Sequence, residues 1–216
     1  MNESDIYRNW QHRLLYTSTY AGIPTIKAPT DFWMYQELVY EYKPDVIIEI
    51  GNHRGGMLVA FSQWMRDIFE NREYNDEHYF HHVYGIDIDH SNIASRVWFD
   101  PWITLITGDA IQVVDQVKEK IYPGYSRALV IEDSSHTYEN TLGVLNTYCD
   151  LIQVGGYFIV EDTICHHGLD VGPNPGPMEA VEAFLKTHRD FIPDRSREAY
   201  GLSWNPKGYL KRLFYD

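Results

Sequence analysis

Residues 45–56 read DVIIEIGNHRGG, so an apolar run leads into a turn that holds three glycines. Short runs rich in Val and Ile, bounded by turn residues, are typical of strands buried on both faces of a sheet. The residues after the turn repeat apolar side chains at helical spacing, at Leu58, Phe61, Met65 and Ile68. The stretch therefore predicts a buried strand, a glycine-rich turn and an amphipathic helix over residues 56–69.

The same alternation of strand and helix continues along the chain. Further strands are expected over residues 82–88, 103–106, 127–131 and 157–160, and two antiparallel strands within residues 191–213. Helices are expected over residues 31–42, 110–120, 140–152 and 178–186, with a short helix capped by Ser91. This order predicts an α/β fold of the Rossmann-like kind, with a mostly parallel seven-stranded sheet, an antiparallel edge strand and helices on both faces.

The composition indicates one acidic globular domain. A length of 216 residues suits a single domain over residues 31–216, preceded by an N-terminal arm or short helix over residues 1–30 that packs over it. The formal net charge of -13 disfavours a nucleic-acid partner and an anionic membrane surface. Because the first residues lack a signal-peptide pattern and only two cysteines are present, a cytoplasmic location is expected. Residues 70–77 and 166–177 are the loops expected to be mobile.

Three acidic side chains stand where predicted strands end. Asp133 follows an apolar run at residues 129–131, and Glu161 and Asp162 follow residues 157–160. Since the carboxyl ends of parallel strands share one edge of a sheet, these carboxylates are expected to converge. Exposure to solvent is the simpler explanation of any single acid, but crowded carboxylates repel one another unless a cation joins them. Oxygen ligands alone favour Mg²⁺ over zinc, so a magnesium site is predicted.

The glycine-rich turn has a spacing of its own. Gly51 and Gly55–Gly56 give Gly-x-x-x-Gly-Gly, which differs from the Gly-x-Gly-x-x-Gly of dinucleotide enzymes, and no phosphate-binding Gly-Lys-Ser/Thr follows. With Glu49 before the first glycine, the turn resembles the first motif of class I S-adenosylmethionine-dependent methyltransferases. Cofactor contacts are therefore expected from Glu49, Gly51, Asn52 and Gly55, while an ordinary strand-to-helix turn is the alternative.

Two later strand ends fit the same cofactor. Asp87 lies where methyltransferases of this class bind the two ribose hydroxyls, with Asp89 as the second candidate, and a carboxylate there accepts both hydroxyl protons. Asp109 and Ala110 lie where the adenine is usually held, although Asp109 could instead cap a helix that begins at Ala110. Asp133 completes the expected cofactor contacts.

His136 is the candidate general base. It lies three residues after Asp133, and an imidazole titrates near neutral pH, so it could take the proton of a hydroxyl bound at the metal. The alternative is a hydrogen-bonded residue at a helix start. His166 and His167 lie on the expected mobile loop and are possible substrate contacts only.

Nearly the whole chain resembles the cephalosporin hydroxylase / rhamnosyl O-methyltransferase family. The resemblance is carried by KAPTD at 27–31, WMYQE at 33–37, PDVIIE at 44–49, DSSH at 133–136, GGY at 155–157, EDT at 161–163, GPMEA at 176–180 and NPKGYL at 205–210. It implies a class I methyltransferase fold, magnesium at Asp133, Glu161 and Asp162, and a histidine base at His136. Met57 departs from the family, whose first motif often continues Gly-Gly-Ser.

The expected function is therefore S-adenosylmethionine- and Mg²⁺-dependent O-methylation, with catalysis by His136 and Asp133. The expected acceptor is a hydroxyl of a sugar or natural-product scaffold, of glycoside or polyketide type, and a homo-oligomer is expected. One alternative is a component of a β-lactam hydroxylation or methoxylation system, which predicts oxygen consumption. Another is a non-catalytic protein of the same fold, which predicts cofactor binding without methyl transfer.

Overall fold

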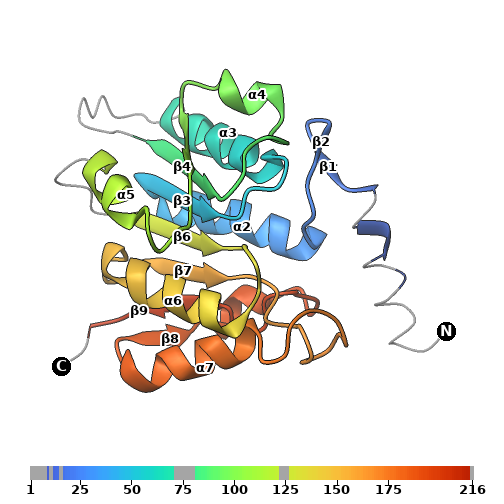
Figure 1. Ribbon diagram of the computed structural model, residues 1–216, viewed down its shortest axis with the longest axis vertical. Helices are drawn as coiled ribbons and strands as arrows, with labels where there is room; N and C mark the ends of the chain where they lie inside the picture. Colours follow the sequence, from blue (N-terminus) through green and yellow to red (C-terminus); the bar gives the residue numbers. More distant parts are fainter. Residues whose placement is uncertain (1–8, 10–11, 15–16, 71–80, 122–126, 215–216) are drawn as a thin grey trace.

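The computed structural model describes residue 9 and residues 12–14, 17–70, 81–121 and 127–214 (Figure 1). Within these residues, seven strands form one sheet in the order β5-β4-β3-β6-β7-β9-β8. Their bounds are β3 Val46–Ile50, β4 His82–Asp87, β5 Ile103–Thr107, β6 Ala128–Glu132, β7 Tyr157–Val160, β8 Phe191–Pro193 and β9 Tyr209–Arg212. Strands β3 to β7 pair in parallel, and β9 runs antiparallel to both β7 and β8. The predicted mostly parallel sheet is thus confirmed.

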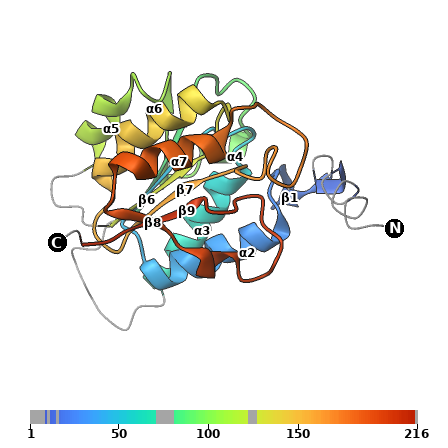
Figure 2. The same ribbon diagram turned by 90° about the horizontal axis from the view of Figure 1, so that it is seen from below.

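Helices cover both faces of this sheet (Figure 2). One face carries α2 Pro29–Tyr42 and α3 Gly56–Glu70, together with the short α4 Ser95–Trp98. The other carries α5 Val114–Lys120, α6 Tyr138–Tyr148 and α7 Pro177–Thr187. None of the helices described is both long and apolar enough to cross a bilayer.

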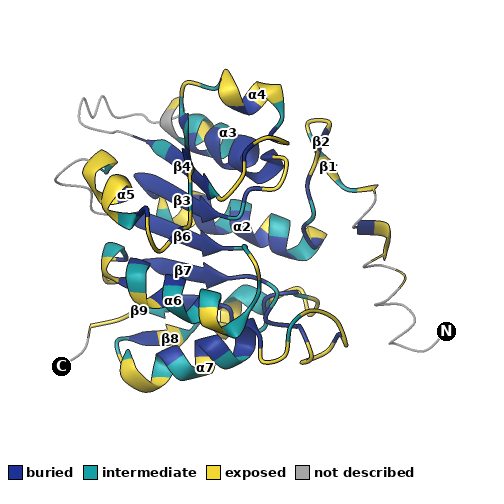
Figure 3. Cartoon of the chain, in the orientation of Figure 1, coloured by how far each residue is buried: buried dark blue, intermediate teal, exposed yellow. Residues whose placement is uncertain are grey.

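The central strands are buried because both of their faces are covered, as Figure 3 shows. Side chains alternate between the faces of a strand, so successive residues enter different clusters. In β6, Leu129 and Ile131 pack against α2 and α3, whereas Val130 packs against α6 and α7. This double burial explains the continuous apolar runs of the sequence.

Some element bounds differ from those predicted. The helix expected from Ala110 begins only at Val114, because Asp109 first closes a turn through its main-chain carbonyl, which accepts from the N–H groups of Gln112 and Val113. Ser91 caps no helix: its N–H and hydroxyl donate to the Asp89 carboxylate, and α4 begins at Ser95. Helix α6 begins two residues earlier than expected and is followed by the 3₁₀ turn η1 Cys149–Leu151. A second 3₁₀ turn, η2 Arg195–Glu198, separates β8 from β9.

The segment before α2 contains a few helical residues and a small hairpin. Residues 12–14 and 17 are helical, and a small hairpin follows, with β1 Thr19–Tyr20 and β2 Ile23–Pro24. Residues 24–27 then run along the carboxyl edge of the sheet and help to line the pocket there. The mobile loop expected at residues 70–77 lies outside the described residues from residue 71 onward.

Candidate active site

A pocket of about 560 Å³ lies at the carboxyl ends of the parallel strands. It is lined by the ends of β3 to β7 and by the segment before α2. The predicted site residues in its lining are Glu49, Gly51, Asn52, Asp87, Asp109, Ala110, Asp133, His136 and Asp162. Gly55 and Glu161 are not in the lining: Gly55 closes the turn with φ +81°, and Glu161 is buried against Lys27.

Gly51 allows the ends of β3 and β6 to meet. Its φ of +87° belongs to the left-handed region that favours glycine. A Cβ at this position would collide with the main-chain carbonyl of Asp133 and lie 2.8 Å from the Cα of Ser134. The glycine of the motif is therefore what lets the Asp133 main chain lie against the turn.

A hydrogen-bond network fixes the turn to the neighbouring strand. The N–H of Asn52 donates to Asp87 at 2.8 Å, and its side-chain amide donates to the Glu49 carbonyl at 3.0 Å. The buried His90 lies 3.0 Å from the amide oxygen of Asn52 and 2.8 Å from the Thr107 hydroxyl. Since burial lowers the pKa of His90, the neutral imidazole donates to Asn52 and accepts from Thr107. Sequence reasoning missed His90.

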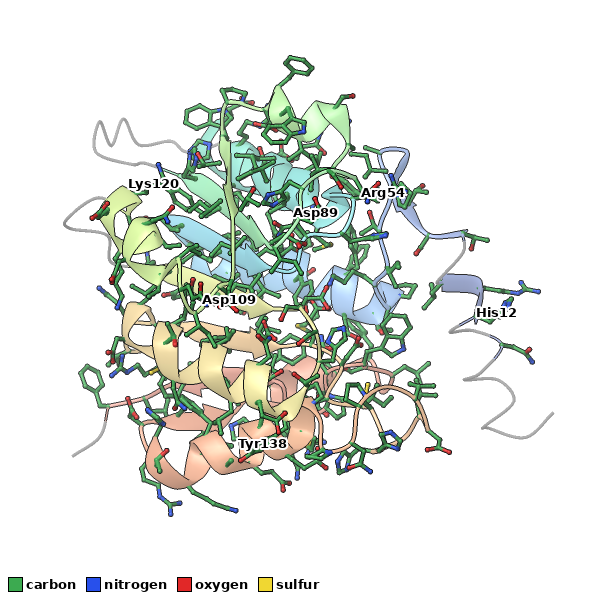
Figure 4. All side chains as sticks on the ribbon, viewed as in Figure 1. His12, Arg54, Asp89, Asp109, Lys120 and Tyr138 are labelled. Atoms are coloured by element: carbon green, nitrogen blue, oxygen red, sulfur yellow. The ribbon has the colours of Figure 1, made fainter. Side chains whose placement is uncertain are left out.

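The two further aspartates after β4 and β5 differ in placement. Figure 4 labels Asp89 and Asp109 in the loops that follow these strands. Asp89 is exposed, engaged with Ser91 and outside the pocket lining, which leaves Asp87 as the candidate for the ribose. Asp109 lines the pocket, yet its carboxylate also accepts from the N–H of Ile111 at 2.9 Å, so it closes a turn as well.

Asp133, His136 and Asp162 come together on one side of the pocket. Their ligand atoms lie within 4.8 Å of one another, and His136 Nε2 is 3.3 Å from Asp162 and 3.9 Å from Asp133. His136 has φ +57° and Asp162 φ +56°, a conformation that costs a residue with a side chain about 1–3 kcal/mol. Burial raises the pKa of Asp162 to about 6, an effect that a bound cation would oppose.

Glu161 contacts Lys27, whereas Asp162 contacts His136. The ammonium of Lys27 forms an ion pair with Asp133 and lies 2.6 Å from Glu161 Oε2. The second oxygen, Oε1, is buried and has no hydrogen-bond partner among the described residues. Burial, and next the Asp133 carboxylate, raise the pKa of Glu161 well above its ordinary value.

Lys27 was not predicted as a site residue. Burial acts to lower its pKa, but the surrounding carboxylates, above all Asp133, raise it beyond the ordinary value, so Lys27 is an ammonium. The signal in the sequence was a lone lysine between apolar residues at 26–29. Similarly, burial raises the pKa of Glu49 to about 8, although Lys27 opposes the shift.

The two loop histidines lie outside this cluster. His167 pairs with Glu179 at 2.7 Å, and His166 pairs with Asp170 at 3.0 Å. Neither is in the pocket lining. Their suggested contact with substrate stays a prediction.

The sequence model of the family "Rhamnosyl O-methyltransferase/CmcI" matches residues 12–213. A rhamnosyl O-methyltransferase of Mycobacterium tuberculosis strain H37Rv is 32% identical over 215 residues, covering 95% of this chain and 83% of the relative. The Mycobacterium leprae enzyme of the same name is 30% identical over 206 residues, covering 91% and 83%. This chain belongs to the rhamnosyl O-methyltransferase/CmcI family.

Solved structures of methyltransferases superpose on this chain and share its fold. The structure described as "cmcI-D160 Mg-SAM" superposes with a TM-score of 0.70 at 24% identity, covering 91% of this chain and 77% of the other. The apo structure of CalS11, a TDP-rhamnose 3'-O-methyltransferase, gives 0.52 at 17% identity, covering 87% and 88%. The expected family, the Rossmann-like fold and an O-methyltransferase enzyme are thereby confirmed.

Proposed function

We propose that this family member transfers a methyl group from S-adenosylmethionine to a sugar hydroxyl, with Mg²⁺ bound at the acidic cluster. The expected acceptor is a rhamnosyl group, because relatives 30–32% identical over most of this chain are rhamnosyl O-methyltransferases. The observation that carries the proposal is the meeting of Asp133, His136 and Asp162 beside the glycine-rich turn.

The residues at the cluster fit a hard divalent cation. Asp133 and Asp162 offer carboxylate oxygens to the pocket, and Glu161 holds a buried oxygen without a hydrogen-bond partner among the residues described. A buried carboxylate oxygen without a hydrogen-bond partner is costly, and a bound cation would lower that cost. When bound, Mg²⁺ lowers the pKa of a coordinated hydroxyl and makes it a better nucleophile.

The chain's own groups have separate tasks in this proposal. Asp87, whose carboxylate is aimed by the Asn52 N–H, accepts from the ribose of the methyl donor, and Gly51 leaves room for the donor beside β3. His136 Nε2 receives the proton of the acceptor hydroxyl, and Asp162 at 3.3 Å stabilises the imidazolium that results. Much of the rate comes from holding donor and acceptor in line.

The test is transfer of a labelled methyl group to rhamnosides, with and without a chelator. His136→Asn keeps a residue type that tolerates the left-handed conformation, and should lower kcat by about 100-fold or more. His188→Asn is the matched control, since His188 lies outside the pocket lining and has no suggested contact with substrate. Binding of S-adenosylhomocysteine, measured by calorimetry, should be the same in both variants.

The outcomes separate the alternatives. Equal turnover in His136→Asn and wild type would refute the assigned base, and full activity in chelator would refute the metal. Binding of S-adenosylhomocysteine without transfer to any acceptor would favour the non-catalytic alternative. Oxygen consumption that depends on this protein would favour the β-lactam system. The homo-oligomer and the cytoplasmic location stay predictions.

A further inference from the structure

Lys27 brings a positive charge into a place crowded with carboxylates. Its side chain is 5% exposed, and its ammonium contacts Asp133 and Glu161, which lie more than a hundred residues away in the sequence. The main chain around it is firmly held, since Thr25 donates to Ser18 at 3.0 Å and the buried Ala28 packs with Ile164 and Trp204. The ammonium is therefore fixed rather than free to move with a loose arm.

Lys27 uses only one oxygen of each carboxylate. It contacts Oδ2 of Asp133 and Oε2 of Glu161. The other oxygen of Asp133, Oδ1, faces His136 at 3.9 Å, and Oε1 of Glu161 has no hydrogen-bond partner among the residues that the structure describes. The lysine thus orients both carboxylates and leaves one oxygen of each for another ligand.

The charge of the cluster follows from this arrangement. When all three carboxyl groups are ionised, as ligands of a metal must be, Asp133, Glu161 and Asp162 carry three negative charges. Lys27 balances one of them, which leaves two for a single divalent cation. We propose that Lys27 is a positioning residue of the metal site: it holds Asp133 and Glu161 in place and, as a fixed positive charge, limits the affinity of the cluster for divalent cations. This inference rests on the proposed function, because it concerns the same metal site.

Removing Lys27 has two opposing effects on metal affinity. Loss of an orienting partner weakens a metal site by about 10- to 100-fold in typical cases. Loss of the positive charge of Lys27 strengthens metal binding, because the ammonium and the metal contact the same carboxylates and repel each other. Charges a few ångströms apart interact strongly at the low effective dielectric of a buried site.

The gain should exceed the loss here, because the main chain still holds the ligands. The Asp133 N–H donates to Ile50 at 2.8 Å, and the Asp162 N–H donates to Asn205 at 2.9 Å. These bonds do not depend on Lys27, so the main chain of both aspartates keeps its place in Lys27→Met, and only the orientation of the carboxylates that contact Lys27 loses support.

The experiment is calorimetric titration with Mn²⁺ alone, without methyl donor or acceptor. Lys27→Met should bind Mn²⁺ about tenfold more tightly than wild type or better, whereas Lys27→Arg, which keeps the charge, should stay within about threefold of wild type. Arg127→Met is the control: Arg127 is also ion-paired, with Asp45 at 3.0 Å, but lies outside the pocket lining and should leave the affinity unchanged.

A second background guards against misfolding. Lys27→Met leaves buried carboxylates uncompensated, which is strongly destabilising, so the comparison is repeated between Glu161→Gln and Lys27→Met/Glu161→Gln. The double variant loses one charge of each sign, and it should again bind Mn²⁺ more tightly than Glu161→Gln.

The results also separate this inference from the proposed function. Unchanged or weaker Mn²⁺ binding on removal of Lys27, in either background, would overturn the inference while leaving a metal site intact. Absence of Mn²⁺ binding in wild type and variants alike would overturn the metal site, and the inference with it.

Discussion

Gly51→Ala tests whether the glycine-rich turn exists to let two strand ends touch. Two costs are expected from the geometry. Alanine at φ +87° enters the left-handed region, which costs roughly 1–2 kcal/mol. Its Cβ would also lie 2.6 Å from the carbonyl carbon of Asp133, and such overpacking costs about 1–3 kcal/mol more. The free energy of unfolding should therefore fall by about 2–5 kcal/mol.

A matched control separates the two costs. Gly155 has nearly the same conformation, with φ +84°, but a Cβ there would meet nothing within 4 Å among the described residues. Gly155→Ala should therefore lose only the roughly 1–2 kcal/mol of the left-handed conformation. Gly155 also lies outside the pocket lining, so its substitution should leave cofactor binding intact.

The measurement is urea unfolding of the two variants and the wild type, followed by circular dichroism, together with calorimetric binding of S-adenosylhomocysteine. Gly51→Ala should be the less stable variant and should bind the ligand more weakly, since relief of the collision shifts Asp133 or the turn. Equal stability losses in Gly51→Ala and Gly155→Ala, with equal ligand binding, would refute the close approach of β3 and β6 as the reason for this glycine.

Two further predictions concern buried or pocket-lining carboxylates. Asp87→Asn should weaken S-adenosylhomocysteine binding by about 10- to 100-fold, because hydrogen bonds to a charged acceptor are worth about 1.5–3 kcal/mol. Asp89→Asn, at an exposed residue outside the pocket lining, should leave binding unchanged, and equal effects of the two substitutions in calorimetry would contradict the assignment. Burial raises the pKa of Glu49 to about 8 from 4.5, so its stabilising contribution is complete below pH 4.5 and is lost as the pH rises to about 8. Glu49→Gln should therefore match wild type near pH 4 and exceed it in unfolding free energy above pH 8, by an amount on the order of a few kcal/mol; a gap that does not change with pH would contradict this.

Local sequence signals were sufficient to predict the strands of the sheet and most of the acidic residues that line the pocket. Apolar runs located the five parallel strands, because a strand covered on both faces carries few polar residues. The acids directly after those runs then had to lie at one edge, and Asp87, Asp133 and Asp162 do line the pocket. The start of α5 was predicted wrongly, because one interpretation made Asp109 the cap of a helix, whereas Asp109 closes a turn ahead of that helix.

What the sequence left open depends on contacts between distant segments. Glu161 and Asp162 are adjacent and were treated alike, yet both follow the last residue of β7, and the left-handed φ of +56° at Asp162 turns its side chain toward a different partner. Glu161 meets Lys27 from the N-terminal segment, whereas Asp162 meets His136. No local periodicity can reveal a lysine that pairs across 106 positions, so the charge balance of the site was not predictable from the motifs alone.

The C-terminal motif at residues 205–210 holds the acidic motif at residues 161–163 in the conformation that the site requires, which includes the left-handed main chain of Asp162. A residue with a side chain stays in that conformation only where its surroundings hold it there. The Asn205 side chain accepts from the Asp162 N–H at 2.9 Å, and Pro206 accepts from the Thr163 hydroxyl at 2.7 Å. The Val160 N–H donates to Gly208, which has no room for a Cβ against that same strand. The C-terminal motif therefore hydrogen-bonds to the main chain on both sides of Glu161, at Val160 and at Asp162. Together the two motifs place the Asp162 carboxylate in the pocket.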